Sequence, residues 1–336
     1  MPDVLDRQTP PEIAASGAPT IATVDIPECD VCGATISTPI ATGFDYELIT
    51  CTNQWRYVRC DECSHVWINP RPAPDTLPTI YPDTYYSYHY DDISPILRKG
   101  KEAMDSLKIG KILKVAGGLP ERYLDVGCGD GRYLRTLARR GVPASGLFGL
   151  ELDETTVERL REQGFGAYCE RVETTERFPD GSLDLVTMFH VIEHVASPAV
   201  VVDRLTAMLR PGGVLALETP NIDSLDARLF HDGRWGGYHI PRHWHLFNPE
   251  TLRKLLEERG LEVQTVRYQT GHSFWMYSLH HALRYKERPR PGLAKLFDPL
   301  SSTVPLIAFT GFDQARSKVG AKTSAMLFIA RKPTNP

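Results

Sequence analysis

The chain has 336 residues, 42% of them hydrophobic, and a formal net charge of −4 at pH 7. This length suits one large domain plus a small one, and the apolar content suffices for a sizeable core. The charge argues against a general nucleic-acid binder, no apolar run could span a membrane, and nothing ahead of Cys29 resembles a secretory signal, so we expect a cytoplasmic protein.

Two cysteine pairs follow an N-terminal segment that we expect to be a disordered tail. Residues 1–26 are rich in Pro, Ala and Thr and lack any periodic pattern. Within residues 27–75, the pairs Cys29-x-x-Cys32 and Cys60-x-x-Cys63 have the spacing of a zinc ribbon with four thiolate ligands. A zinc ion would replace the core that so short a segment cannot supply.

Disulfide pairing is the alternative for these cysteines, and it requires an oxidising compartment. Strands at about residues 40–50 and 54–59 would carry the two cysteine turns of the ribbon. The remaining cysteines are interpreted as free thiols: Cys51, Cys128 and Cys169.

Residues 76–110 are interpreted as an aromatic linker followed by a helix near residues 95–115. Five tyrosines lie between Tyr81 and Tyr90. They either fill the interface between the ribbon and the next domain or form a wall of a substrate pocket.

Residues 123–131, Tyr-Leu-Asp-Val-Gly-Cys-Gly-Asp-Gly, predict a loop that binds a nucleotide-like ligand. An apolar strand runs directly into three alternating glycines, and an amphipathic helix follows over residues 132–140. Glycine lets the backbone approach a ligand closely, and the helix N-terminus is positive. Glu151, at the end of a predicted strand over residues 145–152, could take both hydroxyls of a ribose, with Asp153 as the second candidate.

Further predicted strands alternate with helices along the chain. A Pro-Asp-Gly-Ser turn at residues 179–182 precedes an apolar strand at 183–189, and a Pro-Gly-Gly turn precedes a strand at 214–218. This alternation is typical of an α/β fold with a parallel sheet.

Four segments of the sequence resemble the class I S-adenosylmethionine-dependent methyltransferases. They are LDVGCGDG (124–131), GLELD (149–153), FPDGSLDLVTMFHVIEHV (178–195) and LRPGGVLALETPN (209–221). The resemblance implies a Rossmann-like seven-stranded sheet, mostly parallel, with helices on both faces and the last strand (324–332) inserted antiparallel. The methyltransferase domain would span residues 111–336, with insertions at 222–248 and 271–322.

The resemblance also implies S-adenosyl-L-methionine as the cofactor. Asp125 and the glycines would hold its amino acid part, and Glu151 its ribose. Many relatives carry an acidic residue near position 172 for the adenine amine, whereas here Val172 is followed by Glu173. The expected cofactor-binding residues are Asp125, Gly127, Cys128, Gly129, Gly131, Glu151, Leu152, Glu173, Phe189 and His190.

The acceptor site is expected above the carboxyl ends of the strands. His190 directly follows a strand and could remove a proton from an acceptor hydroxyl; Glu193 and His194 begin the next helix. These residues could instead only shape the pocket. The pattern His190-x-x-Glu193-His194 is similar to the Glu-x-x-Glu-His motif of ubiquinone-biosynthesis O-methyltransferases, which is associated with a divalent metal, although the first position differs.

Both insertions carry features expected at a substrate site. Residues 234–245 are dense in histidine and aromatic side chains, and we expect His243 and His245 in the pocket, unless they cap the following helix or fill the core. The 271–322 insertion is expected to form a helical cover, over the pocket or at a homodimer contact. Contact with a lipid-linked substrate is the alternative for this cover.

The predicted function is transfer of a methyl group to oxygen or carbon of a small molecule such as a sugar or secondary metabolite, with a histidine as general base. A zinc ribbon followed by a methyltransferase domain is similar to the domain order of the sugar C-methyltransferases of antibiotic biosynthesis, although this chain lacks their additional C-terminal domain. One alternative is an RNA methyltransferase whose ribbon recognises RNA. The other is a non-catalytic module that binds the cofactor while the ribbon docks a protein.

Overall fold

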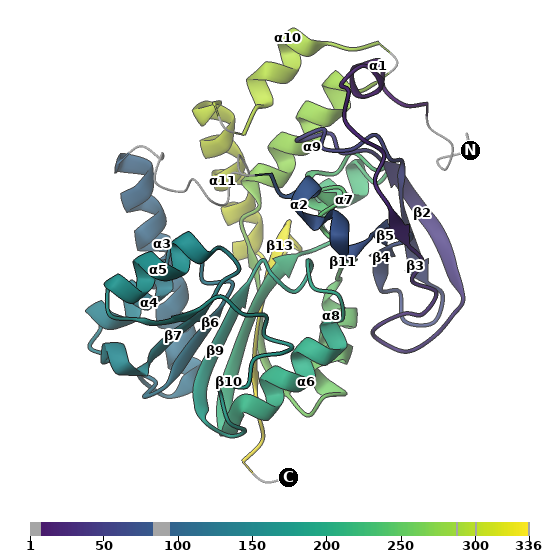
Figure 1. The fold of residues 1–336 in the computed structure, drawn as a ribbon. Helices are drawn as coiled ribbons and strands as arrows, with labels where there is room; N and C mark the ends of the chain where they lie inside the picture. The colour runs from purple at the N-terminus through teal and green to yellow at the C-terminus, as the bar shows by residue number, and fades with distance from the viewer. Residues whose placement is uncertain (1–7, 83–94, 287, 300, 335–336) are drawn as a thin grey trace.

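The computed structural model of the protein describes residues 8–82, 95–286, 288–299 and 301–334 (Figure 1). Most of the tyrosine-rich segment lies outside the described residues. The helix expected after it is α3 (Pro95–Ala116).

A seven-stranded mixed sheet forms the centre of the larger body (Figure 1). Its order is β12 (Glu262–Gln269), β13 (Ala325–Arg331), β10 (Leu209–Pro220), β9 (Leu183–Phe189), β6 (Tyr123–Val126), β7 (Leu147–Leu150) and β8 (Gly166–Tyr168). β13 pairs antiparallel with both β10 and β12, while the pairs from β10 to β8 are parallel. The predicted α/β fold with an antiparallel inserted last strand is confirmed.

Helices cover both faces of this sheet because its inner strands are apolar on both sides. α3, α4 (Arg132–Arg139) and α5 (Glu154–Glu162) supply apolar side chains to one face. α6 (Pro198–Met208) and α8 (Pro249–Glu257) supply them to the other. The side chains of Asp153, Ser197 and Asn248 accept backbone N–H groups at the starts of α5, α6 and α8, so each of these helices begins at a residue suited to that role.

The cysteine-bearing segment forms a four-stranded sheet in the order β11-β4-β3-β2. β2 (Ser37–Gly43), β3 (Trp55–Cys60) and β4 (Val66–Ile68) come from this segment, whereas β11 (His245–Leu246) comes from the 222–248 insertion. We refer to these four strands and their turns as the ribbon. The ribbon sheet is therefore completed by a strand from the larger body.

Two local expectations for this part of the chain differ from the structure. The first predicted strand is shorter than expected, since residues 44–50 form a turn in which Asp45 accepts the N–H groups of Leu48 and Thr50. Residues 8–26, expected to lack order, contain α1 (Pro11–Ala14) and β1 (Thr23–Val24), which pairs with β5 (Arg71–Pro72). This pairing is long-range, so local composition could not reveal it.

The remaining elements are short or belong to the insertions. The connection after the ribbon contains η1 (Pro74–Thr76) and α2 (Leu77–Ile80), and η4 (Ala144–Gly146) precedes β7. The first insertion contains α7 (Leu225–Leu229) and η5 (Gly236–Tyr238). The second contains α9 (His272–Arg284), α10 (Pro291–Ala294), η6 (Lys295–Phe297) and α11 (Thr303–Lys318).

The second insertion forms the expected helical cover, with α9 and α11 lying at the upper end of the sheet in Figure 1. Asp313 of α11 ties the cover together, because its carboxylate accepts the N–H of Gly271 at 3.0 Å and the indole N–H of Trp275 at 3.3 Å. Among the described residues, no helix combines the length and apolarity needed to cross a bilayer.

Candidate active site

The loop after β6 exposes backbone at its middle glycine. Gly127, Gly129 and Gly131 all have positive φ, of 69°, 50° and 78°. A Cβ at Gly127 would lie 2.3 Å from Val191, and one at Gly131 would lie 2.3 Å from Leu160. At Gly129, no described atom lies within 4 Å of such a Cβ. Gly129 therefore faces space through which a ligand can approach the backbone.

Glu151 follows β7 and reaches back to this loop. Its Oε2 accepts the N–H of Gly129 at 2.9 Å, and its Oε1 accepts the N–H of Leu152 at 2.7 Å. Further lone pairs on the two oxygens remain for ribose hydroxyls. Leu152 is exposed beside it, and Glu173 is half-buried in the loop after β8.

Asp125 is buried at the end of β6. Thr187 donates a hydrogen bond to its Oδ1 at 2.6 Å, and burial raises the pKa of the Asp125 carboxyl to about 7. Its Oδ2 is buried without a hydrogen-bond partner among the described residues. An ammonium group of a ligand would satisfy this oxygen, so the position fits the amino acid part of the expected cofactor. Cys128 fills the turn, where burial raises the pKa of its thiol.

His190 lies directly after β9 with a positive φ of 56°. Its Nδ1 is 3.3 Å from Glu193 Oε1 and its Nε2 is 3.2 Å from Glu218 Oε1. Loss of solvation opposes protonation, but the two carboxylates outweigh it and raise the pKa of His190 to about 9. The His190 side chain is 41% exposed, whereas both glutamates are buried, so the imidazole is the accessible member of this group.

Lys108 and Glu218 are site residues that sequence patterns did not identify. Lys108 of α3 lies 2.6 Å from Glu218 Oε2 and 4.9 Å from the ring centre of Phe189. Burial opposes ionisation of Glu218, but Lys108 and His190 lower its pKa to about 2. In the sequence, Glu218 is recognisable only as the end of a predicted strand, and Lys108 only as part of a predicted helix far from it along the chain. Neither position has a local pattern that indicates a site residue.

Glu193, His194 and His243 converge behind His190. One ligand atom from each lies within 4.8 Å of those of the other two. His194 Nδ1 donates to the carbonyl of Arg242 at 3.0 Å and contacts the hydroxyl of Tyr81, while His243 Nδ1 donates to the carbonyl of Gly237 at 2.8 Å. Because a carbonyl oxygen can only accept, both rings carry their proton on Nδ1. Burial lowers the pKa of His194 to about 4 and holds that of His243 well below its usual range.

The structure directs the His245 ring away from this cluster. His245 lies on β11, and its Nδ1 is 3.1 Å from Nε2 of His65 in the ribbon. Its ring also stacks on Phe247. His239, which we did not single out, does join the cluster: its ring centre lies 5.0 Å from that of His243 and 6.3 Å from that of His194.

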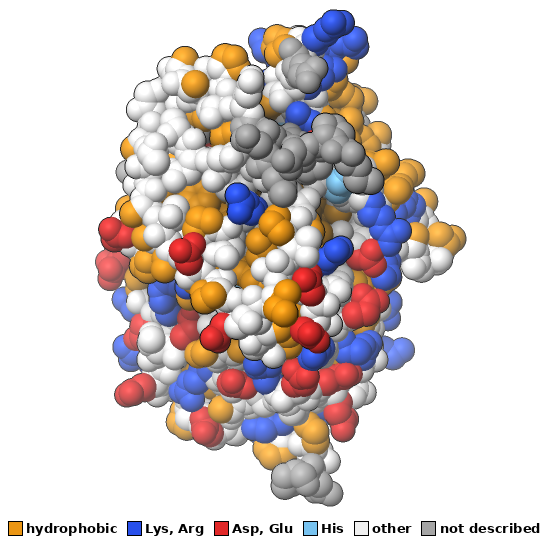
Figure 2. Space-filling view, turned by 90° about the vertical axis from the view of Figure 1, so that its right-hand side faces the viewer, with side chains coloured by type: hydrophobic (Ala, Val, Ile, Leu, Met, Phe, Trp, Pro, Cys, Tyr) orange, Lys and Arg blue, Asp and Glu red, His pale blue; other side chains and the backbone are white. Residues whose placement is uncertain are grey.

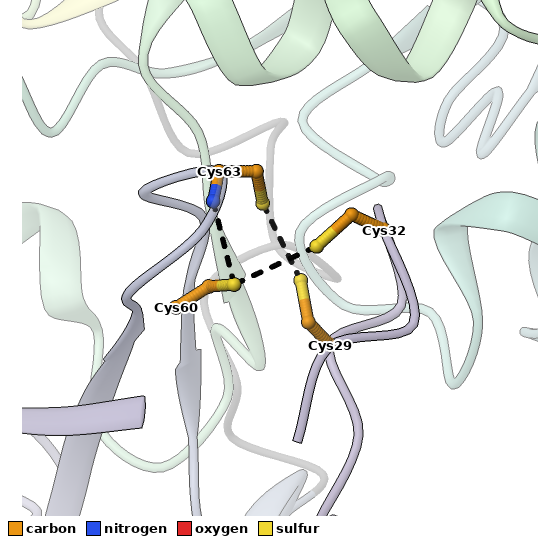
Figure 3. Close-up of side chains that lie close together, drawn as sticks. All are labelled: Cys29, Cys32, Cys60 and Cys63. Atoms are coloured by element: carbon orange, nitrogen blue, oxygen red, sulfur yellow. Dashed lines mark hydrogen bonds between the residues drawn. The ribbon is translucent and has the colours of Figure 1, made fainter. Parts of the chain in front are cut away.

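The four ribbon cysteines come together at two turns (Figure 3). The sulfur atoms of Cys29 and Cys63 are 3.6 Å apart, as are those of Cys32 and Cys60. A tetrahedral zinc with bonds of about 2.3 Å would separate its sulfur ligands by about 3.8 Å, whereas a disulfide needs about 2 Å. The arrangement therefore suits a four-thiolate metal site and not paired disulfides.

The family model described as a methyltransferase domain matches residues 97–266. The chain belongs to this methyltransferase family. The match contains the glycine loop, Glu151 and His190, so the predicted family is confirmed, and S-adenosylmethionine is the cofactor that such a domain binds.

Curated relatives match parts of this methyltransferase. It is 30% identical over 166 residues to the ubiquinone biosynthesis O-methyltransferase of Psychrobacter cryohalolentis, covering 46% of this chain and 59% of the relative. It is 34% identical over 145 residues to a Mycolicibacterium smegmatis protein named "Probable S-adenosylmethionine-dependent methyltransferase", covering 42% and 52% respectively. The matches thus span little more than half the length of these relatives.

A solved structure with a similar fold is the geranyl diphosphate C-methyltransferase of Streptomyces coelicolor. It has 14% sequence identity and a TM-score of 0.46, over 75% of this chain and 88% of that enzyme.

Proposed function

We propose that this methyltransferase transfers a methyl group from S-adenosylmethionine to an oxygen of a small molecule, with His190 as the general base. The observation that carries the proposal is the accessible His190 side chain held between buried Glu193 and Glu218, one residue beyond β9. Carbon of a sugar or secondary metabolite is the second acceptor class. The relative named for ubiquinone biosynthesis O-methylation favours oxygen.

The cofactor residues are proposed from the same edge of the sheet. When bound, S-adenosylmethionine supplies the electrophilic methyl group. Asp125 Oδ2 would accept its ammonium group, Glu151 would accept its ribose hydroxyls, and the backbone at Gly129 would lie alongside it. Leu152 and Glu173 are proposed beside the adenine.

The proposed domain division is a ribbon at 27–75, a linker at 76–110 and the methyltransferase domain at 111–336.

The basicity of His190 suits an acidic hydroxyl. Proton transfer is most effective when the pKa values of base and acceptor are close, and a phenol has a pKa of about 10. A base with a pKa of about 9 matches a phenol or catechol better than an aliphatic sugar hydroxyl. The proton leaves the acceptor oxygen for the imidazole, and Glu193 and Glu218 stabilise the charge that forms there.

A metal-assisted reaction is the second candidate, favoured by the convergence of Glu193, His194 and His243. Two imidazoles and a carboxylate suit a divalent ion, and Glu193 Oε1 is buried without a hydrogen bond of normal geometry among the described contacts. A bound ion would polarise the acceptor oxygen.

We also propose that the four ribbon cysteines hold a structural zinc ion.

On the face of the molecule that carries the ribbon, the charge distribution favours a small acceptor over RNA. On the ribbon side of the molecule, Lys and Arg side chains are interspersed with Asp and Glu side chains instead of gathering into a basic stripe (Figure 2). An RNA groove would need such a stripe.

The test is S-adenosylhomocysteine release with a panel of catechols, phenols, nucleotide sugars and a short RNA, with and without added Mn²⁺. His190 must be neutral to accept a proton, so kcat/KM should rise about tenfold per pH unit and level off near pH 9. His190→Asn, which tolerates positive φ, should lower kcat by about 10²–10⁴ while S-adenosylhomocysteine affinity stays within about twofold.

The exposed His231→Asn variant serves as the matched control and should behave as the unaltered protein. An unchanged pH profile in His190→Asn would eliminate His190 as the base. Turnover on RNA alone would exclude the small-molecule proposal. A rate that depends on Mn²⁺ and loses that dependence in Glu193→Gln would establish the metal-assisted candidate.

A further inference from the structure

We propose that two buried carboxylates of the ribbon, Asp45 and Glu47, are positioning residues for the acceptor-site histidines His194 and His243. That His194 and His243 belong to an acceptor site rests on the proposed function. The contacts that hold the two histidines do not depend on it. The ribbon would then be a working part of the active site, and not a module that recognises a separate partner.

Asp45 and Glu47 lie in one fixed turn. The turn follows β2, and Asp45 closes it by accepting the N–H of Leu48 at 3.1 Å and the N–H of Thr50 at 2.9 Å. A turn closed in this way presents both carboxylates in a set direction. They point into the loop at residues 238–243, which comes from the 222–248 insertion.

Asp45 fixes Arg242. Its Oδ2 accepts a hydrogen bond from Nη2 of Arg242 at 2.9 Å, and its Oδ1 accepts one from Nη1 at 3.2 Å. Both side chains are fully buried. The Arg242 Nε also donates to the carbonyl of Ile80 at 2.7 Å. The carbonyl of Arg242 in turn accepts Nδ1–H of His194. Asp45 therefore holds the group that sets the tautomer of His194.

Glu47 fixes His239. Its Oε2 accepts Nδ1–H of His239 at 2.7 Å, and both side chains are buried. His239 has a positive φ of 40°, and its ring packs edge-on against that of His243. A change in the His239 ring would therefore displace the imidazole that faces Glu193.

Backbone strain marks His239 as more than a packing residue. The described non-glycine residues with positive φ are Ile49, Ser64, His190 and His239. Both histidines among them contact buried glutamates: His239 contacts Glu47, and His190 contacts Glu193 and Glu218. Strain of this kind persists where the surrounding structure enforces it, and it gathers at functional sites.

A third ribbon contact supports the same loop. The hydroxyl of Tyr57 on β3 lies 2.9 Å from the carbonyl of Tyr238 and 2.8 Å from that of His243, sharing its proton between them. The loop forms neither helix nor strand between η5 and β11, and its backbone is held by turn hydrogen bonds such as that from the Arg242 N–H to the carbonyl of His239 at 2.7 Å. The ribbon adds side-chain contacts to these turn bonds.

The test observes the imidazoles directly, in full-length ¹⁵N-histidine-labelled protein saturated with S-adenosylhomocysteine. Long-range ¹H–¹⁵N spectra report the tautomer of each ring, and His194→Gln and His243→Asn assign the signals. Glu47→Met removes the acceptor at similar volume, Glu47→Gln retains an acceptor oxygen, and Glu28→Met changes an exposed glutamate of the ribbon segment. If Glu47→Met does not fold, Tyr57→Phe removes a single ribbon hydroxyl that contacts the same loop.

We expect His194 and His243 each to show one Nδ1–H tautomer in the unaltered protein. In Glu47→Met, the His243 signals should shift or show tautomer exchange, and kcat on any acceptor found should fall about tenfold or more with S-adenosylhomocysteine affinity within about twofold. Glu47→Gln should largely restore both. Unchanged His194 and His243 signals in Glu47→Met, or equal changes in Glu28→Met, would overturn the proposal. The spectra need no acceptor, so failure of the proposed function would be seen separately.

Discussion

The three glycines after β6 have different neighbours despite their equal spacing. Gly127 and Gly131 pack against Val191 and Leu160, so a side chain there would collide with protein. Gly129 packs against nothing described within 4 Å and instead donates its N–H to Glu151. Its lack of a side chain is therefore not explained by packing against the described residues, and it suits the proposed position beside the ligand.

Gly129→Ala tests this difference, with Gly141→Ala as its control. Both glycines have positive φ, and at both a Cβ would have no described atom within 4 Å, so each substitution should destabilise folding by about 1–2 kcal/mol. Only Gly129→Ala should also weaken S-adenosylhomocysteine binding, by about tenfold or more, because its methyl group would occupy the ligand's space. Calorimetric titration and thermal unfolding measure the two effects. Equal affinity in both variants would show that the ligand does not lie against Gly129.

The residue patterns singled out the loop after β6 more fully than the surroundings of His190. Gly129, Glu151 and His190 belong to local motifs that adjoin strands, so their edge of the sheet followed from chain order. Lys108 lies in none of the four family segments, and Glu218 was seen only as the end of a strand within the last of them. Their proximity to His190 depends on how α3 and β10 pack beside it. His245 has the residue type expected in the pocket, but the alternating direction of side chains along β11 takes its ring to His65.

At the scale of elements, a ribbon carboxylate, that of Asp30, caps the N-terminus of α6 and so joins the ribbon to the larger body. Asp30, between the first two cysteines, accepts the hydroxyl of Ser197 and the N–H of Ala199, both at 2.8 Å. The helix therefore begins against a ribbon carboxylate, where the positive end of its dipole favours a negative charge. The Asp30 contact was not predictable, because Asp30 and Ser197 are 167 positions apart and share no local pattern.

Asp30→Ala should lower the free energy of unfolding by about 1–2 kcal/mol, since it leaves an N-terminal amide of α6 without its acceptor. Asp25→Ala, at an exposed carboxylate of the same N-terminal segment, is the control and should have little effect. Denaturant unfolding followed by circular dichroism gives both values. Equal midpoints for the two variants would mean that the cap contributes nothing to stability.

For the whole molecule, the ribbon sheet couples the N-terminal segment to the insertion. β11 pairs with β4, and Trp235, Tyr238 and Trp244 of the insertion share a core with Trp55 and Tyr57 of the ribbon. Loss of the proposed metal should therefore disturb more than the cysteine turns. The effect should extend through β11 to the loop that carries His243.

Cys32→Ser should lower bound zinc from about one equivalent to near zero and reduce the melting temperature by several degrees, because a structural zinc site contributes directly to folding. Cys169→Ser, at a half-buried thiol outside the cluster, should retain the zinc and the melting temperature. Elemental analysis and thermal unfolding provide the measurements. Full zinc content in Cys32→Ser would contradict the four-thiolate site.

The sequence by itself determined the α/β class, the succession of strands and helices along the chain, the glycine loop and the two Cys-x-x-Cys turns, because each depends on residues close together in the chain. Only the tertiary structure decided that β11 completes the ribbon sheet, that Lys108 and Glu218 flank His190, and that Asp45 and Glu47 meet Arg242 and His239. These contacts join residues about 30 to 200 positions apart. Side-chain burial and packing bring such residues together, and neither leaves a periodic signal in the sequence.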